Sequence, residues 1–260
     1  MDKYEKLMRE IIEFLQGTRF FQPRYVGVAH SGPVQGCSDD EIEEAERATG
    51  IKLPAALKAW YRVAGAVPPY LNDYDADHSL DDFKRSQETA AELTQDENCE
   101  WELTEDIIPF SQRIGEQFLF VSTREGNSND PSVFHFMEGN AQPRQISVAF
   151  TAYIREMWLE GLDFPAQSEE RINEIGSWRE KGYDDWMARK RIIDNLRAEA
   201  STVRRQLLET VHQEDLAKDE ITAPRAFQER WLHEFSSSET WQKLQKEGLR
   251  MPFGWVDPPK

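Results

Sequence analysis

The spacing of apolar residues predicts a helix at the start of the chain, from about Asp2 to Gln16. Apolar residues recur there every three or four positions, which places them on one face of an α-helix. They are Tyr4, Leu7, Met8, Ile11, Phe14 and Leu15. Gly17 can end this helix. The Pro- and Gly-marked stretch that follows reads as a strand around Tyr25 to Ala29 and then a loop.

Residues 36–65, "GCSDDEIEEAERATGIKLPAALKAWYRVAG", predict two short helices. Ser38 is a good N-cap, and Glu41 three positions later completes a capping box. Gly50 ends the first helix, and Pro54 suits the first position of the second. The second helix carries an apolar stripe at i, i+3, i+4 and i+7 that faces the core. The stripe consists of Leu57, Trp60, Tyr61 and Ala64.

After a turn-rich loop over residues 66–79, we expect a helix around Leu80 to Leu93, and the apolar period then changes to two. Short runs rich in β-branched and aromatic residues, separated by glycine-containing turns, are typical of antiparallel strands in a meander. The runs are "IIPFSQ", "QFLFVSTR" and "SVFHFME". A short strand and a helix from about Ala149 to Leu159 follow.

Pro165 marks a boundary between a first domain, residues 1–164, and a helical extension, residues 165–260. The extension predicts a long amphipathic helix over 188–212 and one or two more helices in "APRAFQERWLHEFSSSETWQKLQKEGL". Its tryptophans form either a second core or an exposed partner patch. They are Trp178, Trp186, Trp231, Trp241 and Trp255. The predicted fold class is therefore α+β: an antiparallel meander sheet with packed helices, followed by a helical C-terminal region.

The negative charge is concentrated in the first domain. The whole chain has a formal net charge of -17, and residues 39–106 alone contain 19 acidic and 6 basic residues. Such a surface repels a phosphate backbone and an anionic membrane. We therefore expect neither nucleic acid nor a membrane as a partner.

The helix after Ser38 holds more carboxylates than its own stability explains. Asp39, Asp40 and Glu41 lie in the first turn, where the helix dipole favours negative charge. Glu43, Glu44 and Glu46 lie beyond that turn and have no such explanation. Two interpretations stay open: an acidic surface that binds another protein, and one that only keeps the chain soluble.

The order of these elements resembles the SUKH superfamily, which includes bacterial immunity proteins of toxin systems and a domain of fungal cell-wall regulators. The matching positions are Leu53-Pro54, Trp60-Tyr61, Ile108-Pro109-Phe110, Phe118 to Val121 and Phe150. Ala64-Gly65-Ala66 departs from the Asn-Gly-Gly that is usual in the family. Over about residues 1–160 the resemblance implies an antiparallel sheet with helices around it. It also implies that the domain binds another protein.

The chain contains no recognisable catalytic constellation. Its five histidines lie far apart, and His135 falls on the strand face opposite Phe134 and Phe136, which favours a hydrogen-bonded strand histidine over a catalytic base. No P-loop or dinucleotide fingerprint occurs. Cys37 and Cys99 form no metal-like pair and are expected to be free thiols. We expect no enzyme activity and no cofactor.

One segment partly copies a metal site. Asp73, Asp75 and Asp77 follow the opening of a calcium-binding EF-hand loop. His78 and Lys84 stand where that loop requires glycine and a bidentate glutamate. A solvated acidic loop is the favoured interpretation, and no metal site is expected.

These observations predict a protein-binding domain, most simply an immunity protein that neutralises a cationic toxin such as a nuclease. The alternative is an intracellular regulatory or scaffold protein of the same superfamily. The charged N-terminal segment and the absence of an apolar run of about 20 residues favour a cytoplasmic location. The predicted partner-binding residues are Asp39, Asp40, Glu43, Glu44, Glu46, Tyr70, Asp73, Tyr74, Asp75 and Asp77.

Overall fold

The computed structural model describes residues 2–17, 34–69, 78–95, 99, 101–113, 115–124, 127–157, 179–180 and 182–246. The predicted strand at 25–29, most of the loop at 66–79 and the boundary at 164/165 lie outside these residues. The chain divides into two compact units. The N-terminal unit holds residues 1–13, 22–70 and 74–155, and the C-terminal unit holds residues 14–21, 71–73 and 156–260.

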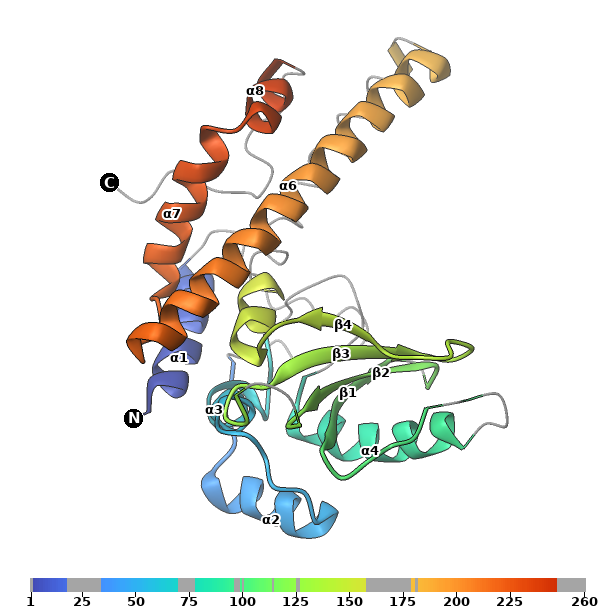
Figure 1. Ribbon diagram of the computed structural model, residues 1–260, viewed down its shortest axis with the longest axis vertical. Coiled ribbons are helices and arrows are strands. Elements are labelled where there is room, and N and C mark those ends of the chain that lie inside the picture. Colours follow the sequence, from blue (N-terminus) through green and yellow to red (C-terminus); the bar gives the residue numbers. More distant parts are fainter. Residues whose placement is uncertain are drawn as a thin grey trace. The chain divides into compact units, whose positions relative to one another are not determined.

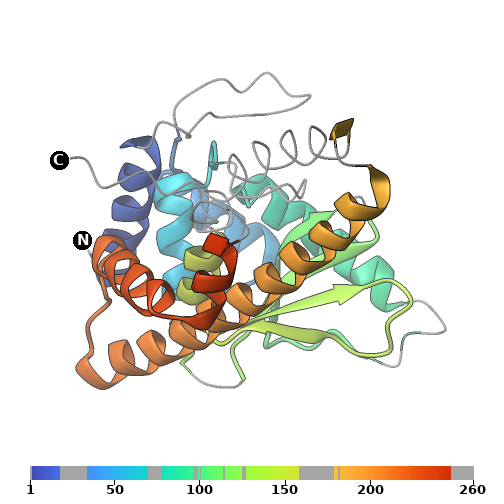
Figure 2. The same ribbon diagram turned by 90° about the horizontal axis from the view of Figure 1, so that it is seen from above.

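A four-stranded antiparallel sheet forms the centre of the N-terminal unit (Figures 1 and 2). Its strands are β1 Ile107–Arg113, β2 Gln117–Ser122, β3 Ser132–Met137 and β4 Arg144–Ser147, in the order β1-β2-β3-β4. Because each strand pairs with the next along the chain, the sheet is the predicted meander. The α+β fold class and the positions of the meander strands are confirmed.

Helix α4, Leu80–Thr94, packs on one face of the sheet through an aromatic cluster. Alternate residues of a strand point to the same face, and the alternating phenylalanines of β2 and β3 therefore meet Ala90 and Leu93 of α4. Trp101 covers these rings, with centroids 5.1 Å from Phe120 and 5.3 Å from Phe136. This packing fixes α4 beneath the strands.

Helix α4 also occupies the outer edge of β1. Gln87 Nε2 donates to the Pro109 carbonyl at 2.6 Å, and the Gln112 amide donates to Asp82 Oδ2 at 3.1 Å. Pro109 itself has no amide hydrogen, which suits an edge strand. Two backbone groups of β1, the Pro109 carbonyl and the Gln112 amide, are thus bonded to side chains of α4.

Three further helices of this unit follow the sequence closely. They are α1 Lys3–Gly17, α2 Asp39–Thr49 and α3 Ala55–Ala64. The capping box between Ser38 and Glu41 is formed, and Gly50 ends α2 with φ 70°. Pro54 is the N-cap of α3 rather than its first residue, because its ψ of 152° keeps it extended. The predicted α3 stripe is buried.

A helix over residues 150–157 completes the described part of this unit. Its N-terminus is capped from outside the helix. Asp130, which is buried, accepts hydrogen bonds from the Thr151 amide at 2.9 Å and from Thr151 Oγ1 at 2.5 Å. The Asn129 carbonyl beside it accepts the Ala56 amide at 2.9 Å. The loop before β3 therefore bonds to the starts of two helices.

The C-terminal unit is helical in its described part: α6 Tyr183–Lys218, α7 Pro224–Ser236 and α8 Glu239–Lys246 (Figure 1). Helix α6 extends beyond the predicted 188–212 at both ends, because Asp184 and Asp185 fill its first turn and it runs on to Asp219. The buried hydrophobic core of the C-terminal unit includes Leu207, Leu208 and Val211 of α6 and Phe227, Trp231 and Phe235 of α7. Trp231 therefore belongs to a second core.

Candidate functional site

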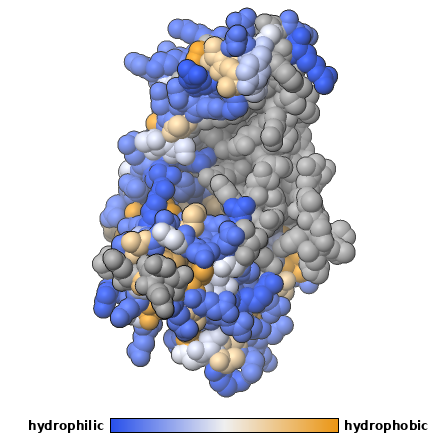
Figure 3. Space-filling model, turned by 90° about the vertical axis from the view of Figure 1, so that its right-hand side faces the viewer, coloured by the Kyte–Doolittle hydropathy of each residue, from blue (hydrophilic) through white to orange (hydrophobic). Residues whose placement is uncertain are grey.

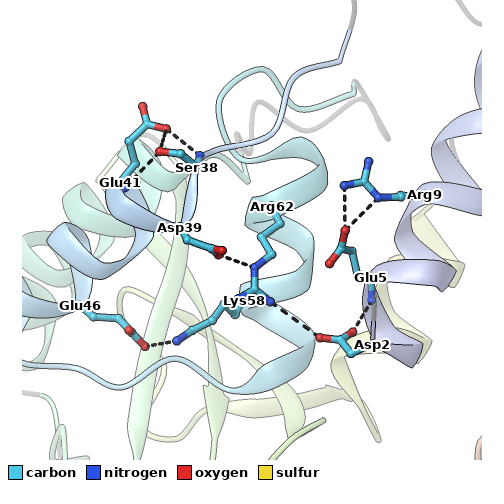
Figure 4. Close-up of polar contacts among 9 residues, drawn as sticks. All are labelled: Asp2, Glu5, Arg9, Ser38, Asp39, Glu41, Glu46, Lys58 and Arg62. Atoms are coloured by element: carbon cyan, nitrogen blue, oxygen red, sulfur yellow. Dashed lines mark hydrogen bonds and ion pairs between the residues drawn. The ribbon is translucent and has the colours of Figure 1, made fainter.

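The acids of α2 divide into two faces. Asp39 and Glu46 are seven positions apart, two helical turns, and both side chains contact cations of α3 (Figure 4). Asp40, Glu43 and Glu44 follow the i, i+3, i+4 spacing of a second stripe and are exposed. We call Asp40, Glu43 and Glu44 the outward face of α2.

Arg62 holds the first turn of α2 against α3. Its Nε donates to Asp39 Oδ1 at 2.6 Å, and its Nη1 lies 3.7 Å from Asp2 at the start of α1. The hydrogen bond with Asp39 is the main cause that raises the pKa of Arg62. One guanidinium thus links the N-terminal ends of α1 and α2 to α3 (Figure 4).

Glu46 holds the last turns of α2 in the same way. Its Oε1 lies 2.9 Å from Lys58 Nζ and accepts the Leu53 amide at 2.8 Å. Burial is the largest influence on the pKa of Glu46 and acts to raise it, but the bonds from Lys58 and Leu53 outweigh burial and lower the pKa. Glu46 therefore fixes the link between α2 and α3.

The outward face keeps most of its charge uncompensated. Glu44 pairs with Arg47 one turn later on the same helix. Within the described residues, Asp40 and Glu43 form no ion pair. Among the residues that Figure 3 colours by hydropathy, hydrophilic ones predominate. The outward face of α2 itself offers exposed carboxylates.

The negative region continues from α2 to the start of α4. The Cys37 thiol has its pKa raised to about 11 by burial first, and then by the charges of Glu41 and Asp81. Glu41 itself closes the capping box, and the bonds from Ser38 lower its pKa. Lys84 opposes this field and pairs with Asp81 at 3.1 Å. With its pKa raised, Cys37 is a poor nucleophile.

The structure brings half of the predicted binding residues onto one helix. Asp39, Asp40, Glu43, Glu44 and Glu46 all lie on α2, but Asp39 and Glu46 are paired with cations of α3. The other five predicted residues lie outside the described residues, and they are Tyr70, Asp73, Tyr74, Asp75 and Asp77. A binding role for any of the ten stays a prediction.

The two cations that create this division are not among the residues predicted from the sequence. Lys58 and Arg62 are four positions apart on α3, so they form one stripe on the side away from the predicted apolar positions. That i, i+4 pair directly follows an acid-rich helix in the chain. It is the signal from which their role could have been inferred.

The histidines in the described part of the chain show no catalytic arrangement. His135 Nε2 lies 2.6 Å from Gln117 Oε1, and burial followed by the charge of Arg144 lowers its pKa. His135 is thus the predicted hydrogen-bonded strand histidine. The described residues contain no group of His, Cys, Asp or Glu able to hold a metal ion. None of the helices among these residues could span a bilayer.

The model of the SMI1 / KNR4 family (SUKH-1) matches residues 36–156, which run from the residue before Cys37 through the sheet to the helix over 150–157. No curated protein matches the chain. The family match and the predicted resemblance agree.

Proposed function

We propose that this protein, whose residues 36–156 match the SMI1 / KNR4 family (SUKH-1), binds a cationic protein partner through the outward face of α2. The sequence also predicts Tyr70, Asp73, Tyr74, Asp75 and Asp77 as binding residues, and these lie outside the described residues. The proposed activity is binding, without catalysis. The family supports a protein-binding role.

The division of the α2 acids is the observation that carries the proposal. Asp39 and Glu46 are compensated by Arg62 and Lys58, so their charges stabilise the fold. Asp40 and Glu43 have no such cation among the described residues, and their field extends into solvent over a Debye length of about 8 to 10 Å. Helix α2 is thus held to α3 by ion pairs on one side and presents negative charge on the other, which suits the binding of a cationic partner.

A nuclease toxin is the partner class that this surface fits best. Such an enzyme needs Lys and Arg to hold phosphates, so an acidic helix offers it complementary potential. Complementary charge mainly accelerates encounter and selects the partner. We therefore propose toxin neutralisation in the cytoplasm as the role of this protein.

Co-expression with a toxin encoded next to the gene of this chain tests the proposal. We expect the full chain to rescue growth and to bind the toxin domain directly. The variant Asp40→Asn/Glu43→Gln/Glu44→Gln removes the outward face and keeps the pairs of Asp39 and Glu46. Its association rate should fall by on the order of tenfold at low salt, and the difference should vanish near about 1 M salt.

A matched control separates the outward face from net charge. Glu102→Gln/Glu105→Gln/Glu138→Gln removes the same charge from exposed positions of the N-terminal unit outside α2. This control should associate at nearly the wild-type rate. Equal slowing by both triple variants would show that total charge acts rather than this helix, and an outward-face variant that binds normally would remove α2 from the mechanism.

A regulatory or scaffold role is the second candidate. The C-terminal unit favours it, because a helical unit with its own core at Phe227, Trp231 and Phe235 goes beyond what the SUKH domain requires. Under this alternative, no neighbouring toxin gene exists and growth rescue is not observed. The same co-expression experiment therefore distinguishes the two candidates.

A further inference from the structure

His78 is a fully buried imidazole whose described hydrogen-bond partners are hydroxyl groups. Its Nε2 lies 2.7 Å from the Tyr153 hydroxyl, and its Nδ1 lies 3.3 Å from Ser111 Oγ. The ring stacks on Tyr153 with centroids 5.6 Å apart and meets Phe110 edge-on at 5.7 Å. A neutral imidazole donates from one nitrogen and accepts at the other, so the uncharged ring satisfies both contacts.

The residue connects four elements of the N-terminal unit. Its carbonyl accepts the Trp60 indole N–H of α3 at 2.8 Å. The next residue, Ser79, caps α4 by accepting the Asp82 amide at 3.0 Å, and the Leu80 amide donates to the Gly65 carbonyl at 2.8 Å. With Ser111 on β1 and Tyr153 on helix 150–157, the ring lies where α3, α4, β1 and that helix meet. We call His78, Trp60, Ser111 and Tyr153 the His78 junction.

The surrounding elements provide no counter-charge to the ring within the described residues. The Tyr153 phenol is the titratable group that touches it. The buried charged residues on these elements are Asp82 on α4 and Arg155 on helix 150–157. Asp82 instead accepts the Gln112 amide and lies 3.8 Å from Arg85. The α3 cations Lys58 and Arg62 pair with carboxylates of α2. Arg113 of β1 is not among the described hydrogen-bond partners of the ring.

We propose that the His78 junction is an acid-responsive latch, in which protonation of the buried imidazole opens the packing of α3, α4, β1 and helix 150–157. The reason is desolvation: a buried cation without an anion is much less stable than the same cation in water. The latch does not depend on partner binding, because every contact in it lies within the N-terminal unit.

The pH window follows from burial. Burial lowers the pKa of His78 from 6.5 to about 4. Between about pH 6.5 and pH 4, His78 is protonated in the unfolded or opened chain but stays neutral in the closed unit. The free energy of unfolding is therefore unchanged above about pH 7 and decreases as the pH falls through this window. Linkage with these two pKa values predicts an opening constant roughly 30-fold larger at about pH 5 than at about pH 7.5.

Hydrogen exchange on the full chain tests the latch. The probes are the Trp60 indole and the Leu80 amide, both bonded at the junction, with rates corrected for intrinsic pH dependence. The wild type should show the roughly 30-fold rise in opening between about pH 7.5 and 5. His78→Gln keeps a donor and an acceptor without titrating, so it should show little change over that range.

His233→Gln is the matched control, because His233 is exposed on α7 and should leave the wild-type pH dependence intact. An unchanged pH dependence in His78→Gln would overturn the proposal. If that variant does not fold, NMR of the His78 ring carbons in the wild type decides. A ring that stays neutral in the folded protein to about pH 5 supports the latch, and a midpoint near the ordinary histidine value of about 6.5 refutes it.

Discussion

Arg62 on α3 donates from Nε to Asp39 on α2 across 2.6 Å, joining residues 23 positions apart in the chain. The bond pairs Asp39 with a cation of the same domain, whereas Asp40, the next residue, forms no ion pair within the described residues. The adjacent carboxylates Asp39 and Asp40 therefore have different roles. One holds the helix in place, and the other contributes to the surface proposed for binding.

A double-mutant cycle with Asp39→Asn and Arg62→Gln should reveal a weak, salt-dependent coupling. The two side chains are 67% and 29% exposed, and pairs of this kind contribute about 0.5 to 1 kcal/mol to the free energy of unfolding. Urea denaturation at low salt and at about 1 M salt measures the coupling. The coupling should shrink at high salt, because exposed charges are screened.

The more exposed pair of Glu44 and Arg47 is the reference for this cycle. Its coupling should be smaller, about 0.3 kcal/mol, as for other pairs within one helix. If the two cycles give the same value at low salt, Arg62 does not anchor α2 as we describe.

Gly36→Ala should destabilise the N-terminal unit more than any other glycine change at α2. A Cβ built on Gly36 would overlap the Arg62 carbonyl group at the end of α3. The adjacent Cys37 amide bonds to the Tyr61 carbonyl at 2.8 Å, so the segment cannot easily move away. We expect a loss of about 2 to 3 kcal/mol, typical of overpacking, measured by urea denaturation.

Gly50→Ala is the comparison for this change. Gly50 has φ +70° and open space around its Cβ position, so only backbone strain acts there. Strain of that kind costs about 1 kcal/mol. A larger loss for Gly50→Ala than for Gly36→Ala would contradict the close approach of residues 36 and 37 to α3.

Asp130→Ala should weaken the attachment of helix 150–157. The buried carboxylate accepts two hydrogen bonds from Thr151 at the start of that helix. Removing a charged acceptor and leaving its donors unpaired costs about 2 to 3 kcal/mol. Hydrogen exchange at the Thr151 amide, together with thermal unfolding of the full chain, measures the loss.

Thr151→Val separates the two bonds. It removes the hydroxyl donor but keeps the amide bond to Asp130, so the loss should be about 1 kcal/mol. A Thr151→Val variant as unstable as Asp130→Ala would mean that the hydroxyl, and not the capping of the helix amide, is the main contribution of Asp130.

Trp231→Ala should strongly destabilise the C-terminal unit. Trp231 is fully buried, and its ring stacks on Phe235 with centroids 4.7 Å apart. Truncating a buried tryptophan costs about 3 to 5 kcal/mol, because a cavity replaces its contacts. Amide exchange in α6 and α7 reports the loss. Trp241→Ala, at a half-buried position of α8, should have a clearly smaller effect on the same amides.

Local chemistry allowed much of the fold to be predicted. The bonds between Ser38 and Glu41 span three residues, and the left-handed backbone at Gly50 depends on that residue alone. The strands also followed from their period, since alternating phenylalanines such as Phe118 and Phe120 bury one face of the sheet. Such features depend on residues close together in the sequence, so they can be predicted from the sequence.

The candidate site was predictable only in its composition. The sequence identifies α2 as an acidic helix, but the rotation of the helix about its axis decides which acids face inward. Arg62 and Lys58 set that rotation from another helix. His78 illustrates the same limit. From the sequence it is notable only because it stands where an EF-hand loop requires glycine, whereas its hydroxyl partners lie 33 and 75 positions away in the chain.

The sequence by itself determined the α+β class, the caps of α2, the meander of strands and the region where negative charge gathers. Tertiary structure alone decided which of those charges are neutralised within the domain and which reach solvent. The physical reason is that helix periodicity and capping act over a few residues, whereas compensation of a charge depends on a partner brought close by folding, as Arg62 is to Asp39.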